Sequence, residues 1–235
     1  MKQIVALPSA NQLTLDHSDK PDGSRLIVAF DFDGTLTTKD TLIEFIRYAC
    51  GTGAFVRGFL RYAHLLVLMR FGLYPNWKAK QKVFAHFFDG MKSEEFDVLC
   101  QRFAQDNQHL LRPKGIETIH QALDKGEEVL IVSASIDNWV RPFFNTKALG
   151  LSPLATEGTQ EPSLCVVGTQ VEIKDGLLTG RFLTKNCYGQ EKVNRILALY
   201  PNRSEYYLTA YGDSRGDKEL LAFADESHYT PFRQP

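Results

Sequence analysis

The strongest constraint on the fold is the stretch LIVAFDFDGTLTTKD at residues 26–40, in which an apolar run ends in two acidic residues. Residues 26–30 have the composition of a strand that is buried on both faces. Asp31 and Asp33 follow two positions apart, and side chains at that spacing point to the same side of an extended chain. We therefore expect the two carboxylates to face one site at the end of this strand.

Two further apolar runs end in polar turns in the same way. They are EEVLIVSAS at residues 127–135 and YYLTAYGDS at residues 206–214, and each is followed by a helical pattern. Alternation of buried strands and helices predicts an α/β fold with a central parallel sheet covered on both faces. Because ligands of such sheets bind beyond the carboxyl ends of the strands, the three polar turns are expected to meet at one edge.

The chain between the first two of these strands is too long for a single crossover helix. Residues 38–111 contain four helical patterns and no strand signal, which predicts an inserted, all-helical cap domain over the sheet edge. Gly51 is expected to end the first of these helices, and Asn76 and Ser93 are the expected N-caps of the last two. The predicted division is a loosely ordered leader, a two-part core domain and the cap domain: residues 1–24, 25–37 with 112–235, and 38–111.

Two turn signals mark the rest of the core. Pro113 is expected to begin a helix that leads into the strand at 127–135. The dipeptide Asp175-Gly176 stands between two runs of alternating polarity, a pattern that predicts a tight β-hairpin.

Composition and charge argue against some classes of function. The formal net charge is −1 over 235 residues, which gives no support to a nucleic-acid partner. The four cysteines are widely spaced without a C-x-x-C pair, which argues against a zinc site, and a chain of this size does not need disulfides for stability. A reducing, cytoplasmic location is the simplest interpretation, and the sequence gives no signal for an oligomeric state.

The helical pattern at residues 54–73 is apolar enough to raise the question of a membrane. Arg57, Arg61 and Arg70 would each be costly at the centre of a bilayer, so a spanning helix is not expected. Arg57, Arg61 and His64 share one face of a helix, which indicates an amphipathic helix. This helix either packs on its neighbours with a polar stripe to solvent, or lies at the inner membrane surface as a peripheral contact.

Three explanations compete for the acid pair at Asp31 and Asp33. Asp and Gly favour turns at strand ends, so the pattern D-x-D-G can be structural. A calcium-binding loop requires glycine at its sixth position and glutamate at its twelfth, whereas here Gly34 is fourth and Leu42 is twelfth. The third explanation is a Mg²⁺-dependent site for phosphoryl transfer, with one carboxylate as nucleophile and the other moving protons.

The phosphoryl-transfer explanation requires more groups at the same edge of the sheet. Clustered carboxylates need a hard cation, and two further acids, Asp213 and Asp217, follow the third apolar run. Charge on a phosphoryl group needs donors, which Ser133 and Lys192 supply, with Lys185 as the alternative lysine. Taken singly, Ser133 could begin a helix, Asp217 could cap one and Lys192 could be solvated, but their joint order favours one site.

Four short motifs, DFDGT, IVSAS, GQEKV and GDSRGD, resemble in order and spacing the four motifs of the haloacid dehalogenase superfamily. The resemblance covers residues 26–230, and the helical insert looks like the cap of the phosphoserine-phosphatase-like branch. It implies a Rossmann-like core with a helical cap, and a phosphatase that forms an aspartyl-phosphate on Asp31. Asp33 would protonate the leaving group and then activate water, and superfamily members with this second acid are generally phosphatases or phosphomutases.

The resemblance also implies a role for each motif residue. Ser133 and Lys192 would hold the phosphoryl oxygens. Mg²⁺ would contact the carboxylates of Asp31 and Asp213 and the backbone carbonyl of Asp33. Asp217 would support this site. The implied sets are catalytic Asp31, Asp33, Ser133 and Lys192; substrate-binding Gly34, Thr35, Ala134 and Ser135; and metal-binding Asp31, Asp33, Asp213 and Asp217.

Within this branch the chain looks more like the bacterial hydrolases grouped with phosphatidylglycerophosphatase C than like phosphoserine phosphatase. The similarity lies in the long apolar cap helix and in the segments NWKAKQKVFAHFFDGM and NCYGQEKV. The implied substrate is a lipid phosphate such as phosphatidylglycerophosphate, or a small soluble phosphomonoester. Two rival interpretations are a phosphoacceptor signalling module, against which the long insert argues, and a catalytically silent Mg²⁺-binding protein, against which the retained acids, lysine and hydroxyl argue.

Overall fold

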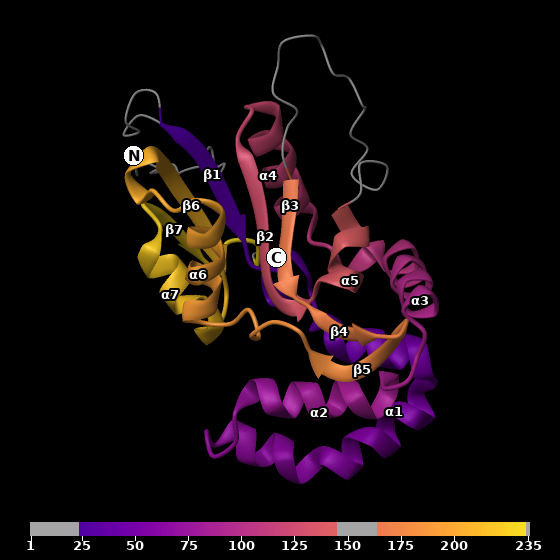
Figure 1. Cartoon of the computed structure of the whole chain (residues 1–235). Helices are drawn as coiled ribbons and strands as arrows, with labels where there is room; N and C mark the ends of the chain where they lie inside the picture. The colour runs from indigo at the N-terminus through magenta and orange to yellow at the C-terminus, as the bar shows by residue number, and fades with distance from the viewer. Residues whose placement is uncertain (1–23, 145–163, 234–235) are drawn as a thin grey trace, which may run out of the picture.

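The computed structural model describes residues 24–144 and 164–233 (Figure 1). Its core is a five-stranded sheet in which all neighbouring strands are parallel, in the order β3-β2-β1-β6-β7. The predicted α/β fold with a central parallel sheet is therefore confirmed. The strands are β1 (Arg25–Phe30), β2 (Glu128–Ile136), β3 (Leu164–Thr169), β4 (Val171–Lys174), β5 (Leu177–Phe182), β6 (Tyr206–Gly212) and β7 (Glu226–Tyr229). The helices are α1 (Thr41–Arg70), α2 (Asn76–Phe88), α3 (Ser93–Asp106), α4 (Pro113–Asp124), α5 (Asp137–Val140), α6 (Gln190–Leu199) and α7 (Lys218–Phe223).

The sheet is covered on both faces, because successive side chains along a strand point to opposite sides. Val28 and Phe30 of β1 belong to the same buried cluster as the apolar side of α4. Ile27 and Ala29 instead share a cluster with α6 and α7 on the other face. Burial on both sides explains why β1 is a continuous apolar run in the sequence.

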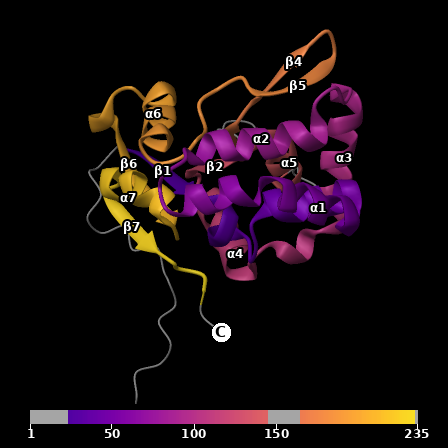
Figure 2. The ribbon, with the colours of Figure 1, turned by 90° about the horizontal axis from the view of Figure 1, so that it is seen from below.

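Helices α1, α2 and α3 (the cap helices) lie between β1 and β2 in the chain. In space they face the edge of the sheet at which the strands have their carboxyl ends (Figures 1 and 2). The helix end predicted at Gly51 is a kink within α1, where this residue has a φ of 78°. Phe45 of α1 anchors the cap helices, since its ring stacks on Trp139 of α5 with centroids 4.8 Å apart and meets Phe103 edge to face. The division of the chain into a core domain and a cap domain of residues 38–111 stays a prediction.

The helix N-caps predicted at Asn76 and Ser93 are wrong by one residue. The cap positions are Pro75 and Lys92, and neither makes a side-chain cap hydrogen bond. Ser93 instead donates its backbone N–H to the carbonyl oxygen of Gly176 at 2.9 Å, because the hairpin lies against this turn. A tertiary contact thus replaces the local cap at the start of α3.

The predicted hairpin is present, with Asp175 (φ 52°) and Gly176 (φ 77°) at the turn between β4 and β5. Positive φ at both central residues is the turn geometry that Asp-Gly favours. The hairpin reaches from the core to the cap helices, where the side-chain oxygen of Gln81 accepts the N–H of Phe182 at 3.0 Å. It thereby ties α2 to the segment that leads into α6.

The leader predicted at residues 1–24 lies outside the described residues, apart from Ser24. Among the helices of the described ranges, none combines the length and the apolar character that crossing a bilayer requires.

Candidate active site

Asp31 and Lys192 form the centre of the site, where β1, β2 and α6 meet. Asp31 directly follows β1 and continues its ladder, since its N–H donates to the carbonyl oxygen of Tyr211 at 2.9 Å. Lys192 lies in the first turn of α6, and its Nζ is 2.5 Å from Oδ1 of Asp31. The lysine is only 1% exposed, so this ion pair is buried. The alternative lysine, Lys185, lies instead in a cavity beside α2.

Asp217 holds Lys192 from a second side. The lysine Nζ is 2.6 Å from Oδ1 of Asp217 and 2.7 Å from the carbonyl oxygen of Val132, so all three ammonium hydrogens have acceptors. The other oxygen of Asp217 accepts the N–H groups of Asp213 and Ser214 and the Ser214 hydroxyl. Asp217 occupies the N-cap position of α7, as the alternative interpretation expects, but its side chain makes no cap hydrogen bond there.

Asp213 lies next to Asp31, at the end of β6. The Thr35 hydroxyl is 3.2 Å from Oδ2 of Asp31 and 3.2 Å from Oδ1 of Asp213, so one hydrogen is shared by two carboxylate oxygens. The other oxygen of Asp213 accepts a hydrogen bond from Arg233. Gly34 permits this close arrangement, because its φ is 86° and an added Cβ would lie 2.5 Å from Oδ2 of Asp213.

Asp33 has different partners from Asp31. Its Oδ1 accepts the backbone N–H of Thr41 at 2.7 Å and the Thr41 hydroxyl at 2.6 Å. The Ser135 hydroxyl donates to its other oxygen. Asp33 is therefore held between the start of α1 and the end of β2, beside the Asp31 carboxylate rather than against Lys192.

The second polar turn is continuous with β2. Ser133 is fully buried within this strand and accepts the N–H of Ser135 at 3.0 Å, so it does not begin a helix. The carbonyl oxygen of Ala134 accepts the hydroxyl of Thr169 at 3.1 Å. The structure thus brings all three residues of this turn to the edge that carries Asp31. Their contacts to a phosphoryl group stay predictions.

Burial raises the pKa of Asp31 to about 7, against the opposing effect of Lys192. Burial also raises the pKa values of Asp33 and Asp213. For Asp217 the effect of burial is outweighed by Lys192 together with the hydrogen bonds from Ser214, so the pKa of this carboxyl lies below its ordinary value. Burial thus disfavours the ionised form of three of the four acids, a cost that a bound cation would offset.

The residues at this edge fit a divalent cation. One carboxylate oxygen from each of Asp31, Asp213 and Asp217 lies within 4.8 Å of the others. The single hydrogen of Thr35 cannot satisfy both carboxylates that it contacts, and Mg²⁺ prefers such oxygen ligands. Both oxygens of Asp217 are taken up by Lys192 and by the donors of Asp213 and Ser214, whereas Oδ2 of Asp31 and Oδ1 of Asp213 share only the Thr35 hydroxyl. These two oxygens are therefore the ones that can hold the ion. The contribution expected from the backbone carbonyl of Asp33 stays a prediction.

Two residues at this edge were not singled out from the sequence. Thr41 follows the helix N-cap Asp40, so its local signal indicates only the start of a helix. Arg233 lies beyond the last motif and is brought to Asp213 by its neighbour Phe232, whose ring stacks on Tyr211 with centroids 5.5 Å apart. No spacing pattern could have found Arg233, because a tertiary contact places it.

Comparisons with known proteins agree with this geometry. The model of a family of haloacid dehalogenase-like hydrolases matches residues 28–222. Protein CicA of Caulobacter vibrioides is 34% identical over 211 residues, which cover 88% of this chain and 87% of CicA. A solved protein of unknown function from Bordetella pertussis Tohama I shares the fold with a TM-score of 0.69 at 20% identity, covering 87% of this chain and 89% of that one. A substrate-bound phosphoserine phosphatase has a TM-score of 0.55 at 20% identity, covering 87% and 85%. The chain therefore belongs to the haloacid dehalogenase-like hydrolase family.

Proposed function

We propose that this protein is a Mg²⁺-dependent phosphomonoester hydrolase that forms a phosphoryl intermediate on Asp31. The main support is the buried arrangement in which Lys192 contacts both Asp31 and Asp217, with Asp213 alongside. Catalysis of phosphoryl transfer depends mainly on positioning the reactants and on stabilising charge electrostatically, and this arrangement supplies charged groups in fixed positions.

In the first step an oxygen of Asp31 attacks phosphorus, and the bond between phosphorus and the ester oxygen breaks. Lys192 lies against Asp31 and balances its negative charge. The leaving oxygen takes a proton from Asp33, and the alcohol departs. Burial raises the pKa of Asp33, which favours the protonated form that a general acid needs.

In the second step water attacks the phosphorus of the aspartyl-phosphate. The water proton passes to Asp33, the bond between phosphorus and Asp31 breaks, and inorganic phosphate leaves. Both acids are then in their starting protonation states. When bound, Mg²⁺ supplies positive charge that neutralises the carboxylates and the transferring phosphoryl group.

Hydrolysis of p-nitrophenyl phosphate with Mg²⁺ tests this proposal. Asp31→Asn removes the nucleophile without changing the size of the side chain, and is expected to leave less than about 1% of the parent rate. Asp124→Asn is the matched control, because this aspartate is exposed at the end of α4. Release of one equivalent of nitrophenol followed by arrest would indicate a phosphoacceptor module, and no release would indicate a silent protein. Either result would contradict the proposal.

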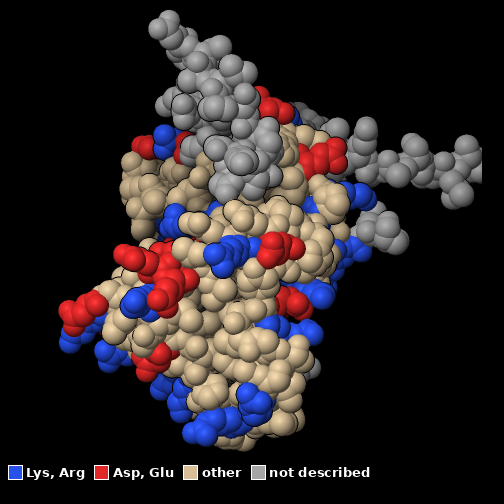
Figure 3. Space-filling model, turned by 90° about the vertical axis from the view of Figure 1, so that its right-hand side faces the viewer, with Lys and Arg blue, Asp and Glu red and all other residues tan. Residues whose placement is uncertain are grey.

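We infer further that the substrate is an amphiphilic phosphomonoester at an anionic membrane surface, as expected for the phosphatidylglycerophosphatase C-like branch. A small soluble phosphomonoester is the second candidate. The supporting observation is the charge of the cap helices: residues 45–88 contain seven Lys and Arg and no Asp or Glu. On the face shown in Figure 3, basic side chains gather at the lower end of the molecule, where the cap helices lie.

Large apolar side chains are exposed in the same segment. Leu60 of α1 and Phe71 and Leu73 of the turn that follows it are all largely exposed. Exposed apolar groups interspersed with basic ones are typical of segments that lie in the interface of an anionic bilayer. Each basic side chain near such a surface contributes about 1 kcal/mol of binding free energy. These two features favour the lipid candidate over the soluble one.

Flotation with vesicles tests the membrane contact. The parent is expected to float with phosphatidylcholine vesicles that contain phosphatidylglycerol, and less with phosphatidylcholine alone. Loss of about 2 kcal/mol in an Arg57→Ala/Arg61→Ala variant lowers the partition coefficient by about thirtyfold. Lys114→Ala/Lys218→Ala removes the same charge from exposed positions outside the cap helices and should float like the parent. A parent that stays unbound, or equal losses in both variants, would contradict the membrane proposal.

A further inference from the structure

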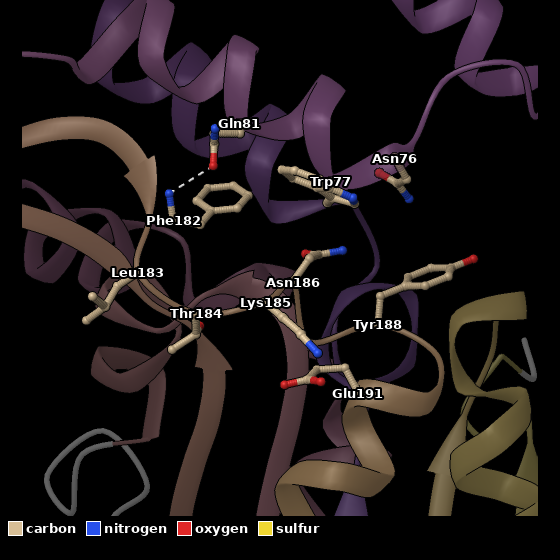
Figure 4. A pocket seen from close by; sticks show the side chains of 10 residues that line it. All are labelled: Asn76, Trp77, Gln81, Phe182, Leu183, Thr184, Lys185, Asn186, Tyr188 and Glu191. Carbon is tan, nitrogen blue, oxygen red and sulfur yellow. Dashed lines mark hydrogen bonds between the residues drawn. The ribbon is translucent and has the colours of Figure 1, made fainter.

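A cavity of about 690 Å³ separates α2 from the segment that joins β5 to α6. Asn76 and Trp77 reach it from α2, while Lys185, Tyr188 and Glu191 line the opposite side (Figure 4). Its volume is in the range of sites that bind a drug-sized ligand, and it exceeds what a phosphate group alone requires. The cavity therefore has room for the part of a substrate that is not phosphate.

Two connections place this cavity beside the residues around Asp31. Glu191, which lines the cavity, directly precedes Lys192 in the first turn of α6. Asn186, which also lines it, lies 3.3 Å from the hydroxyl of Thr169, and that hydroxyl contacts the carbonyl oxygen of Ala134 at 3.1 Å. The cavity is thus linked to the polar turn after β2 by the side chain of Thr169, and Glu191 in its wall neighbours Lys192 along the chain.

The walls of the cavity are largely apolar. Trp77 is 44% exposed and Tyr188 is 40% exposed, although both carry large rings that proteins generally bury. Phe182 and Leu183 extend the apolar lining. The ring of Tyr188 is fixed against Gly216, where an added Cβ would lie 2.5 Å from it. Aromatic side chains that stay exposed in a concave site are typical of a ligand-binding surface.

Two charged side chains, Lys185 and Glu191, also line the cavity. Glu191 forms an ion pair with Arg195 at 2.8 Å, so its charge is balanced within α6. The ammonium group of Lys185 makes neither an ion pair nor a hydrogen bond with any residue in the part of the chain that the structure describes. The uncompensated charge in the cavity is therefore positive.

We propose that this cavity binds the apolar part of the leaving alcohol of an amphiphilic phosphomonoester, with Trp77 and Tyr188 as specificity-determining residues. The inference rests on the proposed phosphatase function and adds to it the site that selects the substrate. The hydrocarbon of the alcohol lies against the two rings while the phosphoryl group reaches Asp31. A small polar ester leaves these rings in water and gains nothing from their burial.

The test is a series of n-alkyl phosphates from ethyl to octyl, each assayed with Mg²⁺ below its micelle concentration. In the parent, kcat/KM is expected to rise by up to about fourfold for each added methylene group until the cavity is full. Trp77→Ala and Tyr188→Ala are expected to lower the ratio of kcat/KM between hexyl and ethyl phosphate by at least about tenfold, and Trp77→Phe to retain most of it. Leu199→Ala changes an exposed residue at the far end of α6 and should keep the parent ratio.

The outcomes separate this inference from the function on which it rests. Hydrolysis of ethyl phosphate without any dependence on chain length would overturn the cavity assignment and leave the phosphatase proposal standing. A parent ratio that persists in both alanine variants would overturn the assignment of Trp77 and Tyr188. Failure to hydrolyse every ester would overturn the proposed function itself.

Discussion

Asp31→Asn is expected to stabilise the metal-free protein while it abolishes hydrolysis. Burial raises the pKa of Asp31 from 3.8 to about 7, so the folded chain holds this proton more tightly than the unfolded chain does. Between pH 3.8 and pH 7 the folded state therefore loses stability as the pH rises. At 1.36 kcal/mol for each pKa unit, the whole loss is roughly 4 kcal/mol. An asparagine does not ionise, so the variant escapes this loss.

Thermal unfolding in EDTA at pH 5 and at pH 8 measures the effect. About 3 kcal/mol of the loss falls between these two pH values, and a protein of this size changes its Tm by about 2–4 °C per kcal/mol. The Tm of Asp31→Asn relative to the parent is thus expected to increase by about 6–12 °C from pH 5 to pH 8. Asp124→Asn, with its exposed carboxyl replaced, should follow the parent at both pH values.

Two results would refute the reasoning that ionised Asp31 is costly in its buried position. One is a Tm difference that is the same at both pH values, and the other is a variant less stable than the parent at pH 8. The effect of saturating Mg²⁺ on the Tm values tests the same reasoning. The ion should raise the Tm of the parent at pH 8 more than that of Asp31→Asn, because the variant has lost a charged ligand.

Three more predictions concern the same groups. Lys192→Ala leaves Asp31 and Asp217 without their shared cation and should lower the free energy of unfolding at neutral pH by about 3–5 kcal/mol, measured in urea; a change below about 1 kcal/mol would contradict a buried ion pair. Binding of Mg²⁺ at pH 6.5 should release roughly 0.8 proton, because Asp31 has a pKa of about 7 and must lose its proton to bind the ion. At pH 8.5 the release should be far smaller. Calorimetry in buffers of different ionisation enthalpy measures the number of protons released. Arg233→Gln removes a guanidinium that competes with Mg²⁺ for Asp213, so the Mg²⁺ concentration that gives half-saturation should fall by about fivefold. A rise in this concentration would show that Arg233 orients Asp213 instead.

The residues at the sheet edge could be predicted from the sequence because local rules place them. Asp31 follows an apolar run, and the carboxyl ends of parallel strands meet at one edge whatever lies between them in the chain. Asp213 and Ser133 reach this edge for the same reason, from β6 and β2. The hairpin at Asp175-Gly176 could also be predicted from the sequence, since this dipeptide favours positive φ at both positions.

The remaining features depend on contacts between distant segments, which no local pattern records. Ser93 is not an N-cap because its N–H reaches a carbonyl of the hairpin, and Arg233 meets Asp213 because a neighbouring ring stacks on β6. The cavity is formed by Trp77 of α2 and Tyr188 of the segment before α6, and neither residue has a sequence signal that points to the other. Only the packing of the cap helices over the sheet brings them to one site.

The charges at the sheet edge explain why stability and activity should respond in opposite ways to a change at Asp31. Four carboxylates face two cations there, Lys192 and Arg233, so the fully ionised site carries two uncompensated negative charges. Burial disfavours the ionised form of these carboxyls, which raises the pKa values of Asp31, Asp33 and Asp213. The two positive charges of one Mg²⁺ offset this deficit, and binding of the ion displaces the proton of Asp31. The deficit that destabilises the folded chain at high pH is therefore the same one that favours the ion, and it leaves Asp31 unprotonated, as a nucleophile must be.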